Sequence, residues 1–218
     1  MVGQDQRALT ASQERRSQAA RRDQSERGLV RAAIAVVSEE GVGAATFEAI
    51  ARRGGYSRGL VGQRFGSKRG LIEAVINYLE EMQEARALLT GIDNLPGLEA
   101  LVTHVDLYLH QLSLENEGQA YFRLLSSAVA DISELQAAFA ATHGRVRERL
   151  EAWVRRGQAE GDIRPEIDPS AAALMIGSLL LGVSMQVLVD PAMALDPIRA
   201  TSIATLRLAF ATPQAARP

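Results

Sequence analysis

The chain has 218 residues, of which 47% are hydrophobic and none is cysteine. This apolar content is enough to bury a sizeable core, and the lack of cysteine excludes disulfide bonds, thiol nucleophiles and thiolate metal sites. The net charge of −2 hides an uneven distribution, because residues 1–70 carry 13 basic and 7 acidic side chains whereas residues 71–218 carry 11 and 19. A basic first third suits an end that meets a polyanion, although a solvated basic helix face explains the charge equally well.

Residues 1–22 are polar, without an apolar period, and we expect them to form a flexible basic N-terminal arm. Such an arm either adds affinity for DNA or keeps the chain soluble. The N-terminus shows no hydrophobic secretory segment, and we expect a cytoplasmic protein. Asp23 and Glu26 have capping-box spacing, and the apolar period after them predicts a helix that Gly41 ends.

A compact run of short helices is predicted next. Thr46 can cap a helix that the glycine pair at positions 54–55 ends. Ser57 can cap a second short helix ending at Gly66, and Ser67 can cap a longer one after it. Two short helices joined by a tight turn that contains glycine indicate a helix-turn-helix.

Beyond residue 80 the spacing of apolar residues stays helical, and strand-like alternation never lasts for more than a few residues. Helix breaks are expected near 91–97, 115–118, 132, 161–169 and 190–197. The stretch from Ala171 to Val189 is nearly all apolar and long enough to span a bilayer, but it lacks flanking aromatic or basic anchors. We therefore expect no membrane span there but a helix buried all round by protein, in an all-α fold.

The segment ATFEAIARRGGYSRGLVGQRFGSKRGL resembles the N-terminal DNA-binding domain of the TetR family of regulators, over roughly residues 27–76. It shares the capping Thr, an Ile-Ala pair, a glycine turn, the Ser at the start of the recognition helix, and Phe-x-Ser-Lys-x-x-Leu. A second stretch, GDIRPEIDPSAAALMIGSLLLGVSMQVLVDP, is similar to the divergent C-terminal domain of many members. The resemblance implies a three-helix DNA-binding domain (residues 23–68) and a larger helical domain (residues 69–218) that forms a homodimer through C-terminal helices and usually binds a small-molecule inducer.

The predicted recognition helix runs from Ser57 to Phe65, with its N-terminal residues nearest the base edges of the major groove. Arg58 or Arg64 can bind guanine O6 and N7, and Gln63 has the matching geometry for adenine. Thr46 and Lys68 match family phosphate-binding positions at helix starts, where free N–H groups attract phosphate. The candidate DNA-binding residues are Thr46, Ser57, Arg58, Gly59, Gly62, Gln63, Arg64 and Lys68.

Two glycines make this helix unusual. Gly59 and Gly62 each cost about 1 kcal/mol relative to alanine inside a helix. Either the helix backbone must approach the groove closely at these two positions, or the protein tolerates any residue there. Many family members carry Tyr-x-His before the Phe, where this chain has Gly62-Gln63-Arg64. The phosphate contact of that tyrosine is therefore missing, and Gln63 or Arg64 would have to replace it.

The C-terminal region offers candidates for an apolar ligand cavity, although ordinary core and dimer contacts explain each of them as well. They are His104, Tyr108, Phe122, Leu125, Trp153, Met175 and Leu179. The few histidines do not converge as a metal site requires, no enzyme motif is visible, and we expect no cofactor.

We therefore expect a non-enzymatic DNA-binding transcriptional regulator. The specific expectation is a ligand-responsive repressor that binds a palindromic double-stranded DNA operator as a homodimer, released by a small-molecule inducer whose identity the sequence does not give. Activation is also open, because it depends on where the operator lies relative to the promoter. The alternative is a helical small-molecule-binding or scaffold protein that has lost operator binding.

Overall fold

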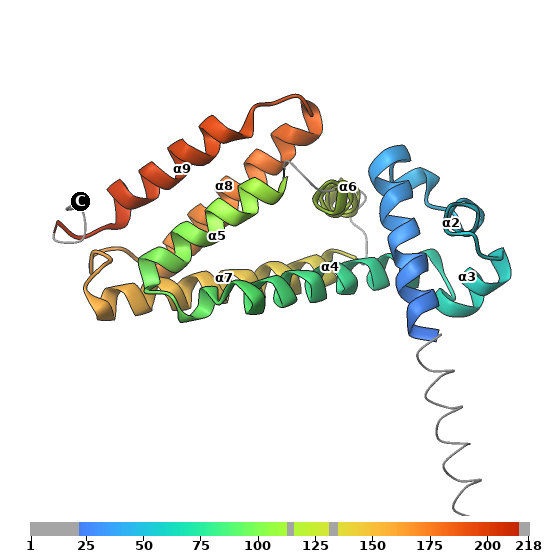
Figure 1. The fold of residues 1–218 in the computed structure, drawn as a ribbon, viewed down its shortest axis with the longest axis horizontal. Coiled ribbons are helices and arrows are strands. Elements are labelled where there is room, and N and C mark those ends of the chain that lie inside the picture. Colours follow the sequence, from blue (N-terminus) through green and yellow to red (C-terminus); the bar gives the residue numbers. More distant parts are fainter. Residues whose placement is uncertain (1–21, 113–115, 131–134, 214–218) are drawn as a thin grey trace, which may run out of the picture. The chain divides into compact units, whose positions relative to one another are not determined.

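The computed structural model describes residues 22–112, 116–130 and 135–213, and Figure 1 traces them as a succession of helices. The chain divides into two compact units, residues 1–78 and residues 79–218. Within the described ranges no residue lies in a β-strand, apart from the isolated bridge that pairs Ile163 with Ala211. The predicted all-α fold class is confirmed. The predicted N-terminal arm falls outside the described residues except for its last position.

In the described part of the first unit, residues 22–40 are helical. Residue 22 is already helical, so Asp23 is not the N-cap and the predicted capping box is wrong, because an N-cap residue lies outside the helical conformation. Gly41 ends this helix as predicted, with a φ of 89° that favours glycine and an amide that donates to the Val37 carbonyl at 3.1 Å.

Three further elements complete the first unit, and a fourth begins in it. They are the short 3₁₀ helix η1 (Val42–Ala44), α2 (Phe47–Gly54), α3 (Arg58–Phe65) and the start of α4 (Lys68–Thr90). The core of the unit is formed by aliphatic side chains that the helical period places on inner faces, and among the most buried are Leu29, Val36, Ile50, Val61, Leu71 and Ile76. Because α4 continues to Thr90, a single helix belongs to both units.

The described residues of the second unit form the rest of α4 and six more helical elements. These are η2 (Ile92–Asn94), α5 (Gly97–Leu112), α6 (Asn116–Ala130), α7 (Gln136–Glu160), α8 (Pro169–Val189) and α9 (Leu195–Phe210). Helix α5 packs against α7, α8 and α9, and its apolar side chains form the centre of the core. The predicted breaks near 91–97, 161–169 and 190–197 agree with the gaps between these helices. The break expected at 115–118 is wrong for residues 116–118, which already belong to α6, and the one near 132 lies outside the described residues.

Helices α5 and α7 approach each other closely at a pair of glycines. A Cβ atom added to Gly97 would lie 2.2 Å from the amide nitrogen of Gly157 and 2.3 Å from the carbonyl oxygen of Trp153. The backbone amide of Gly97 also donates to a carboxylate oxygen of Glu160 at 2.7 Å. The start of α5 therefore rests directly on the α7 backbone, and no larger residue fits there.

Two arginines of α9 fasten that helix to α5. Arg207 forms a bidentate pair with Glu99, at 2.5 and 2.8 Å, and Arg199 pairs with Asp106. The hydrogen bond from Arg207 lowers the pKa of Glu99 below its ordinary value, and burial opposes this shift.

Helix α8 differs from its prediction. Asp168 caps the helix by accepting a hydrogen bond from the Ala171 amide at 2.7 Å. Only 33% of the most apolar 18-residue stretch of α8 is buried within the chain. Leu174 is 63% exposed and Val189 is 81% exposed. The expectation of a helix buried all round is therefore not met within this chain, because no described residue packs against its outer face. By length and composition alone α8 could cross a membrane, a criterion that core helices of soluble proteins also meet.

Candidate DNA-binding surface and ligand cavity

The turn between α2 and α3 is built by local hydrogen bonds. The Thr46 hydroxyl accepts from the Ala49 amide at 3.1 Å, and the Ser57 hydroxyl accepts from the Leu60 amide at 3.2 Å. Gly55 ends α2 in the left-handed conformation, with a φ of 73°. Both predicted N-caps therefore form, since the residues preceding α2 and α3 satisfy amides in the first turn. Contacts of Thr46 and Ser57 with DNA stay predictions.

One side of α3 holds the helix to its unit and the other is open. Val61 is fully buried, whereas Arg58, Gly59 and Gln63 are exposed. A Cβ atom on Gly59 would meet no atom within 4 Å. On Gly62 the nearest atoms would be those of the Phe47 ring at 3.8 Å, which is ordinary van der Waals contact. Packing within the chain therefore does not require glycine at either position.

Arg64 does not lie with the exposed residues of α3, although the sequence placed it among the outward positions. Its side chain is 11% exposed, with one guanidinium nitrogen 3.6 Å from Glu26 and another 3.5 Å from the Arg22 carbonyl oxygen. The reason is helical spacing, because residue 64 follows the buried Val61 by three positions and so shares its face. In the free chain Arg64 joins α3 to the first helix instead of reaching outward.

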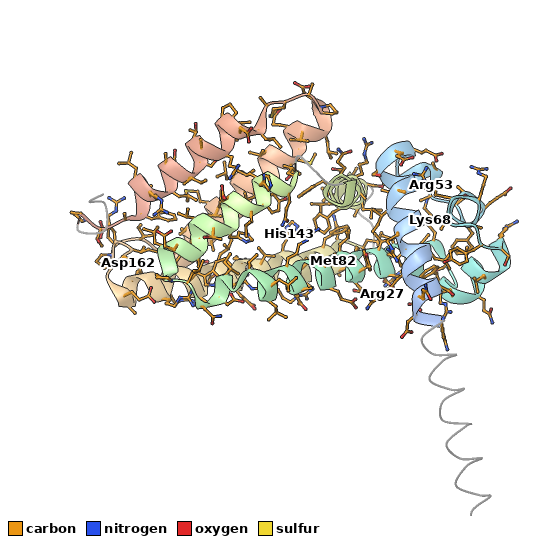
Figure 2. All side chains as sticks on the ribbon, viewed as in Figure 1. Arg27, Arg53, Lys68, Met82, His143 and Asp162 are labelled. Atoms are coloured by element: carbon orange, nitrogen blue, oxygen red, sulfur yellow. The ribbon has the colours of Figure 1, made fainter. Side chains whose placement is uncertain are left out.

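Lys68 stands at the first position of α4, where the Ser67 hydroxyl accepts from the Gly70 amide at 3.0 Å. Its exposed ammonium group donates to the Val42 carbonyl in η1 at 3.1 Å. Figure 2 labels Lys68 and Arg53, both in the first unit, and Arg53 forms a bidentate pair with Glu39 at 2.5 and 2.7 Å. Lys68 is thus a positioned positive charge at a helix start, a geometry that suits phosphate.

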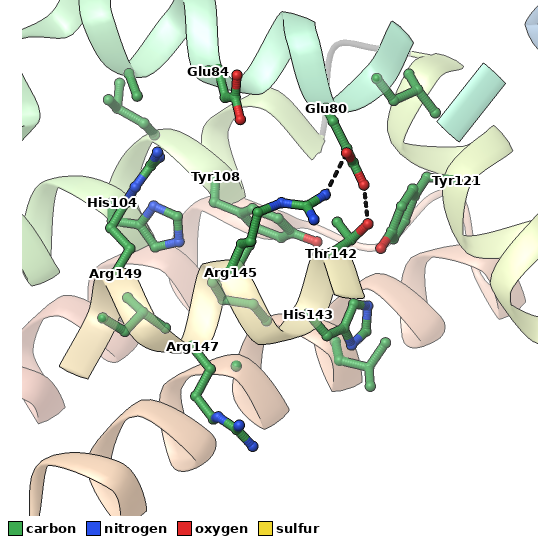
Figure 3. A pocket seen from close by; sticks show the side chains of 18 of the residues that line it. Glu80, Glu84, His104, Tyr108, Tyr121, Thr142, His143, Arg145, Arg147 and Arg149 are labelled. Carbon is green, nitrogen blue, oxygen red and sulfur yellow. Dashed lines mark hydrogen bonds and ion pairs between the residues drawn. The ribbon is translucent and has the colours of Figure 1, made fainter. Parts of the chain in front are cut away.

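The second unit contains a cavity of about 500 Å³ lined by α4, α5, α6, α7 and α8 (Figure 3). Of the predicted ligand-binding residues, His104, Tyr108, Phe122 and Trp153 line it. The other three do not: Leu125 is buried elsewhere, Leu179 is half-buried, and Met175 is 48% exposed. Contact of any of them with a ligand stays a prediction.

The sequence did not indicate a polar cluster on the cavity wall. Glu80 of α4 accepts hydrogen bonds from the Thr142 hydroxyl and, at 2.5 Å, from Arg145, both on α7 (Figure 3). Next to this cluster the rings of Tyr121 and His143 stack, with centroids 6.2 Å apart. More than 60 residues separate Glu80 from its partners, so no local pattern could have found them.

The deepest polar groups of the cavity are uncharged. Burial, aided by the charge of Arg149 and opposed by Asp93, lowers the pKa of His104 to about 4, so its imidazole is neutral at pH 7. Burial likewise raises the pKa of Tyr108, whose hydroxyl lies 2.9 Å from the Ser184 hydroxyl. The Trp153 indole N–H donates to Asp93 at 3.1 Å. The cavity therefore combines aromatic surface with neutral hydrogen-bonding groups.

Comparison with known proteins connects both units to one family. The family profile described as "Bacterial regulatory proteins, tetR family" matches residues 29–75, and the one described as "Tetracyclin repressor-like, C-terminal domain" matches residues 98–206, half of the chain. A curated relative, the HTH-type transcriptional regulator BetI of Serratia proteamaculans, is 45% identical over 51 residues. That match spans 23% of this chain and 26% of BetI, so it relates only part of the two proteins.

Solved structures share the fold over most of the chain. A TetR transcriptional regulator from Chloroflexus aurantiacus is 19% identical, with a TM-score of 0.76 over 87% of this chain and 97% of its own. A transcriptional regulator from Saccharomonospora viridis, in complex with choline, is 18% identical, with a TM-score of 0.77 over 87% and 99%. SmeT, the repressor of the Stenotrophomonas maltophilia multidrug efflux pump SmeDEF, is 24% identical, with a TM-score of 0.70 over 88% and 93%.

The helix-turn-helix, the helical second unit and these matches agree. The chain belongs to the TetR family of transcriptional regulators, which are DNA-binding proteins and not enzymes.

Proposed function

We propose that the protein is a ligand-responsive repressor that binds a palindromic operator as a homodimer. The observation that carries the DNA-binding part is the open side of α3. Val61 anchors the helix, while Arg58 and Gln63 extend from it into solvent without a packing role. Arginine and glutamine are side chains that read guanine and adenine in the major groove, and Lys68 supplies a positive charge for the phosphate backbone.

The outer face of α8 supports a homodimer through the C-terminal helices. Six of its exposed positions repeat at alternating spacings of four and three, the pattern of a helix–helix seam, and none of the six is charged. They are Ala171, Met175, Ser178, Gly182, Met185 and Val189. We call these six residues the α8 seam. Exposed apolar patches of this kind mark interaction surfaces, and a two-fold dimer would bury the same seam on both subunits.

Helix α9 presents a second surface without charge. Its exposed side chains include small residues and Leu208, which is 85% exposed. They are Ala200, Thr201, Ala204, Thr205 and Leu208. Small side chains allow helices to approach closely, so α8 and α9 each offer a surface that suits a second copy of the chain.

The cavity in the second unit supports a response to a small molecule. Its volume of about 500 Å³ lies within the usual range of ligand pockets, and neutral polar groups are spaced along aromatic walls. The structural relative from Saccharomonospora viridis was solved with choline, and SmeT represses a multidrug efflux pump. A ligand that binds one conformation of the dimer better than another shifts the population between them, and so shifts operator affinity.

Binding to DNA from the upstream region of the protein's own gene tests the operator claim. Arg58→Ala should alter sequence preference at a cost of about 1–3 kcal/mol, and Lys68→Ala should weaken binding to all sequences and lower the salt slope by about 1. Arg155→Ala, which removes an exposed arginine of the second unit, is the matched control and should leave binding unchanged. A lack of preference over scrambled DNA, both there and in a random-site selection, would exclude an operator-binding function.

A second candidate is a helical small-molecule-binding or scaffold protein without an operator. Two observations favour it: glycine occupies position 62, and Arg64 is engaged with the first helix. This candidate predicts that small molecules stabilise the protein while no DNA sequence is preferred.

A reporter gene behind the operator separates repression from activation, because deletion of the regulator raises expression in the first case and lowers it in the second.

A further inference from the structure

We propose that the cavity takes an aromatic organic anion, whose acidic group is bound by Arg149 and His104 at one end of the cavity. This assignment rests on the proposed ligand response and specifies the chemical class of the ligand. Three observations carry it: the balance of charges around the cavity, two polar groups without a protein partner, and the composition of the walls.

Positive charge exceeds negative charge around the cavity. Two acidic side chains, Glu80 and Glu84, line it together with four arginines, at positions 86, 145, 147 and 149. Glu80 is already engaged by Arg145 and Thr142. A ligand cation would therefore enter a region of net positive charge, at a cost that grows as it loses water. A ligand anion would find compensating charge already in place.

Arg149 is the cation best placed to receive that anion. It forms no hydrogen bond or ion pair with any other residue in the described part of the chain. Figure 3 shows it beside His104, and its charge contributes to the lowered pKa of that imidazole. Arg147, by contrast, extends away from this region in Figure 3 and lies 3.8 Å from Glu151. The guanidinium of Arg149 thus retains its full set of donors for a carboxylate.

His104 supplies a second donor at the same place. Its ring lies against Trp153 and Tyr108, yet neither ring nitrogen has a hydrogen-bond partner among the described residues. Neither ring nitrogen is among the fully buried polar atoms that lack a hydrogen-bond partner. At least part of the ring edge is therefore accessible from the cavity that His104 lines. A neutral imidazole carries one N–H, which can donate to a carboxylate oxygen.

Exposed Asp93, which accepts from Trp153, acts on His104 from outside the lining, and among the lining residues Glu84 is the acidic side chain that opposes this arrangement. It reaches toward the same end of the cavity from α4 and has no ion-pair partner among the described residues (Figure 3). Glu84 is exposed, however, whereas Arg149 is half-buried. Water and salt screen the exposed carboxylate more than the half-buried guanidinium, so the positive charge dominates at the proposed site.

The walls favour a flat apolar body. Phe122 and Trp153 are nearly fully buried and contribute ring surface to the cavity. Ser184 donates to the Leu180 carbonyl at 2.7 Å, so the hydrogen bond with Tyr108 uses the tyrosine proton. The Tyr108 oxygen is then left as an acceptor only and does not compete for the ligand anion. Aromatic rings stack at centroid separations of about 4.5–7 Å, so a flat aromatic body suits walls that contain Phe122 and Trp153.

Three probes that share one ring system test the charge preference. We would measure, by isothermal titration calorimetry on the full chain, the Kd of 2-naphthylacetate, 2-naphthylacetamide and (2-naphthylmethyl)trimethylammonium. The anion should bind at least about tenfold more tightly than the amide, as charge-assisted hydrogen bonds imply, and the cation should bind most weakly. Equal or tighter binding of the amide or the cation, or no binding of the anion, would overturn the proposal.

Two variants locate the anion site. Arg149→Gln should remove the preference for the anion over the amide while leaving amide binding unchanged. Arg147→Gln makes the same charge change two residues away on α7 and should keep the preference. If both variants lose it equally, or neither does, the assignment to Arg149 is wrong. The thermal unfolding temperature of each variant checks that the fold is intact.

Operator DNA separates this proposal from the proposed function. If naphthylacetate binds with the expected preference but leaves DNA binding unchanged, the ligand class stands and the ligand-responsive repressor fails. If DNA binding is specific but no naphthyl anion binds, the ligand class fails and the repressor stands.

Discussion

Replacing Gly59 and Gly62 of α3 by alanine should stabilise the protein and weaken its binding to DNA. Neither glycine has a positive φ, and the structure leaves room for a methyl group at both positions. Alanine gains about 1 kcal/mol per site over glycine inside a helix, so the double variant should gain about 2 kcal/mol. For a chain of this size each kcal/mol corresponds to a rise of about 2–4 °C in the unfolding temperature. Glycine occupies both positions although alanine would make the free protein more stable. We therefore infer that glycine is needed there for an interaction with another molecule.

The requirement we infer is close approach of the α3 backbone to the major groove. Two methyl groups between helix and bases should then weaken specific binding at least about tenfold, equivalent to about 1.4 kcal/mol. Thermal unfolding and fluorescence anisotropy with operator DNA measure the two effects in parallel. Gly144→Ala, on α7 and also in open space, is the control that should gain stability without changing DNA binding. A stabilised α3 variant with wild-type affinity would show the two positions to be indifferent, and a destabilised one would refute the packing argument.

Three further results are expected. Gly97→Ala should lower the free energy of unfolding by about 2–3 kcal/mol in urea titrations, because its methyl group would collide with the backbone at Gly157; an unchanged midpoint would contradict the close crossing. The pKa of His104 is about 4 in the folded protein, whereas its ordinary value, which we take for the unfolded chain, is 6.5. As the pH falls, the unfolded chain therefore binds this proton before the folded protein does. Stability should therefore drop by about 3 kcal/mol between pH 6.5 and pH 4, and His104→Gln should remove that part of the loss. Gly182→Glu introduces a charge into the α8 seam, at a position where a single chain has open space. In sedimentation experiments this variant should be monomeric, whereas the control variant Gly144→Glu should remain a dimer.

Features fixed by neighbouring residues were predictable from the sequence. Gly41 and Gly55 end their helices with positive φ, and Thr46 and Ser57 cap the helices that follow them. Each depends on the backbone conformation of a single glycine or on a hydrogen bond across three residues, which a local pattern contains. The order of helices and the helix-turn-helix follow from the same local rules.

Features fixed by distant residues were not predictable. The burial of Arg64 depends on where the first helix lies, which no pattern of neighbouring residues specifies. The linkage of Glu80 to Thr142 and Arg145 joins helices far apart along the chain. Composition alone also could not distinguish a helix buried within one chain from one with an apolar outer face, which is why α8 was misjudged.

The continuity of α4 has a consequence for the exchange of parts between regulators. The helix passes without interruption from Lys68 in the first unit to Thr90 in the second. Each residue of an α-helix adds about 1.5 Å of rise and, at 3.6 residues per turn, a rotation of about 100°. A chimera joined within α4 with one residue too many would therefore turn the helix after the junction by about 100° relative to the helix before it. Recombination between relatives should tolerate junctions here only when the helical phase is conserved.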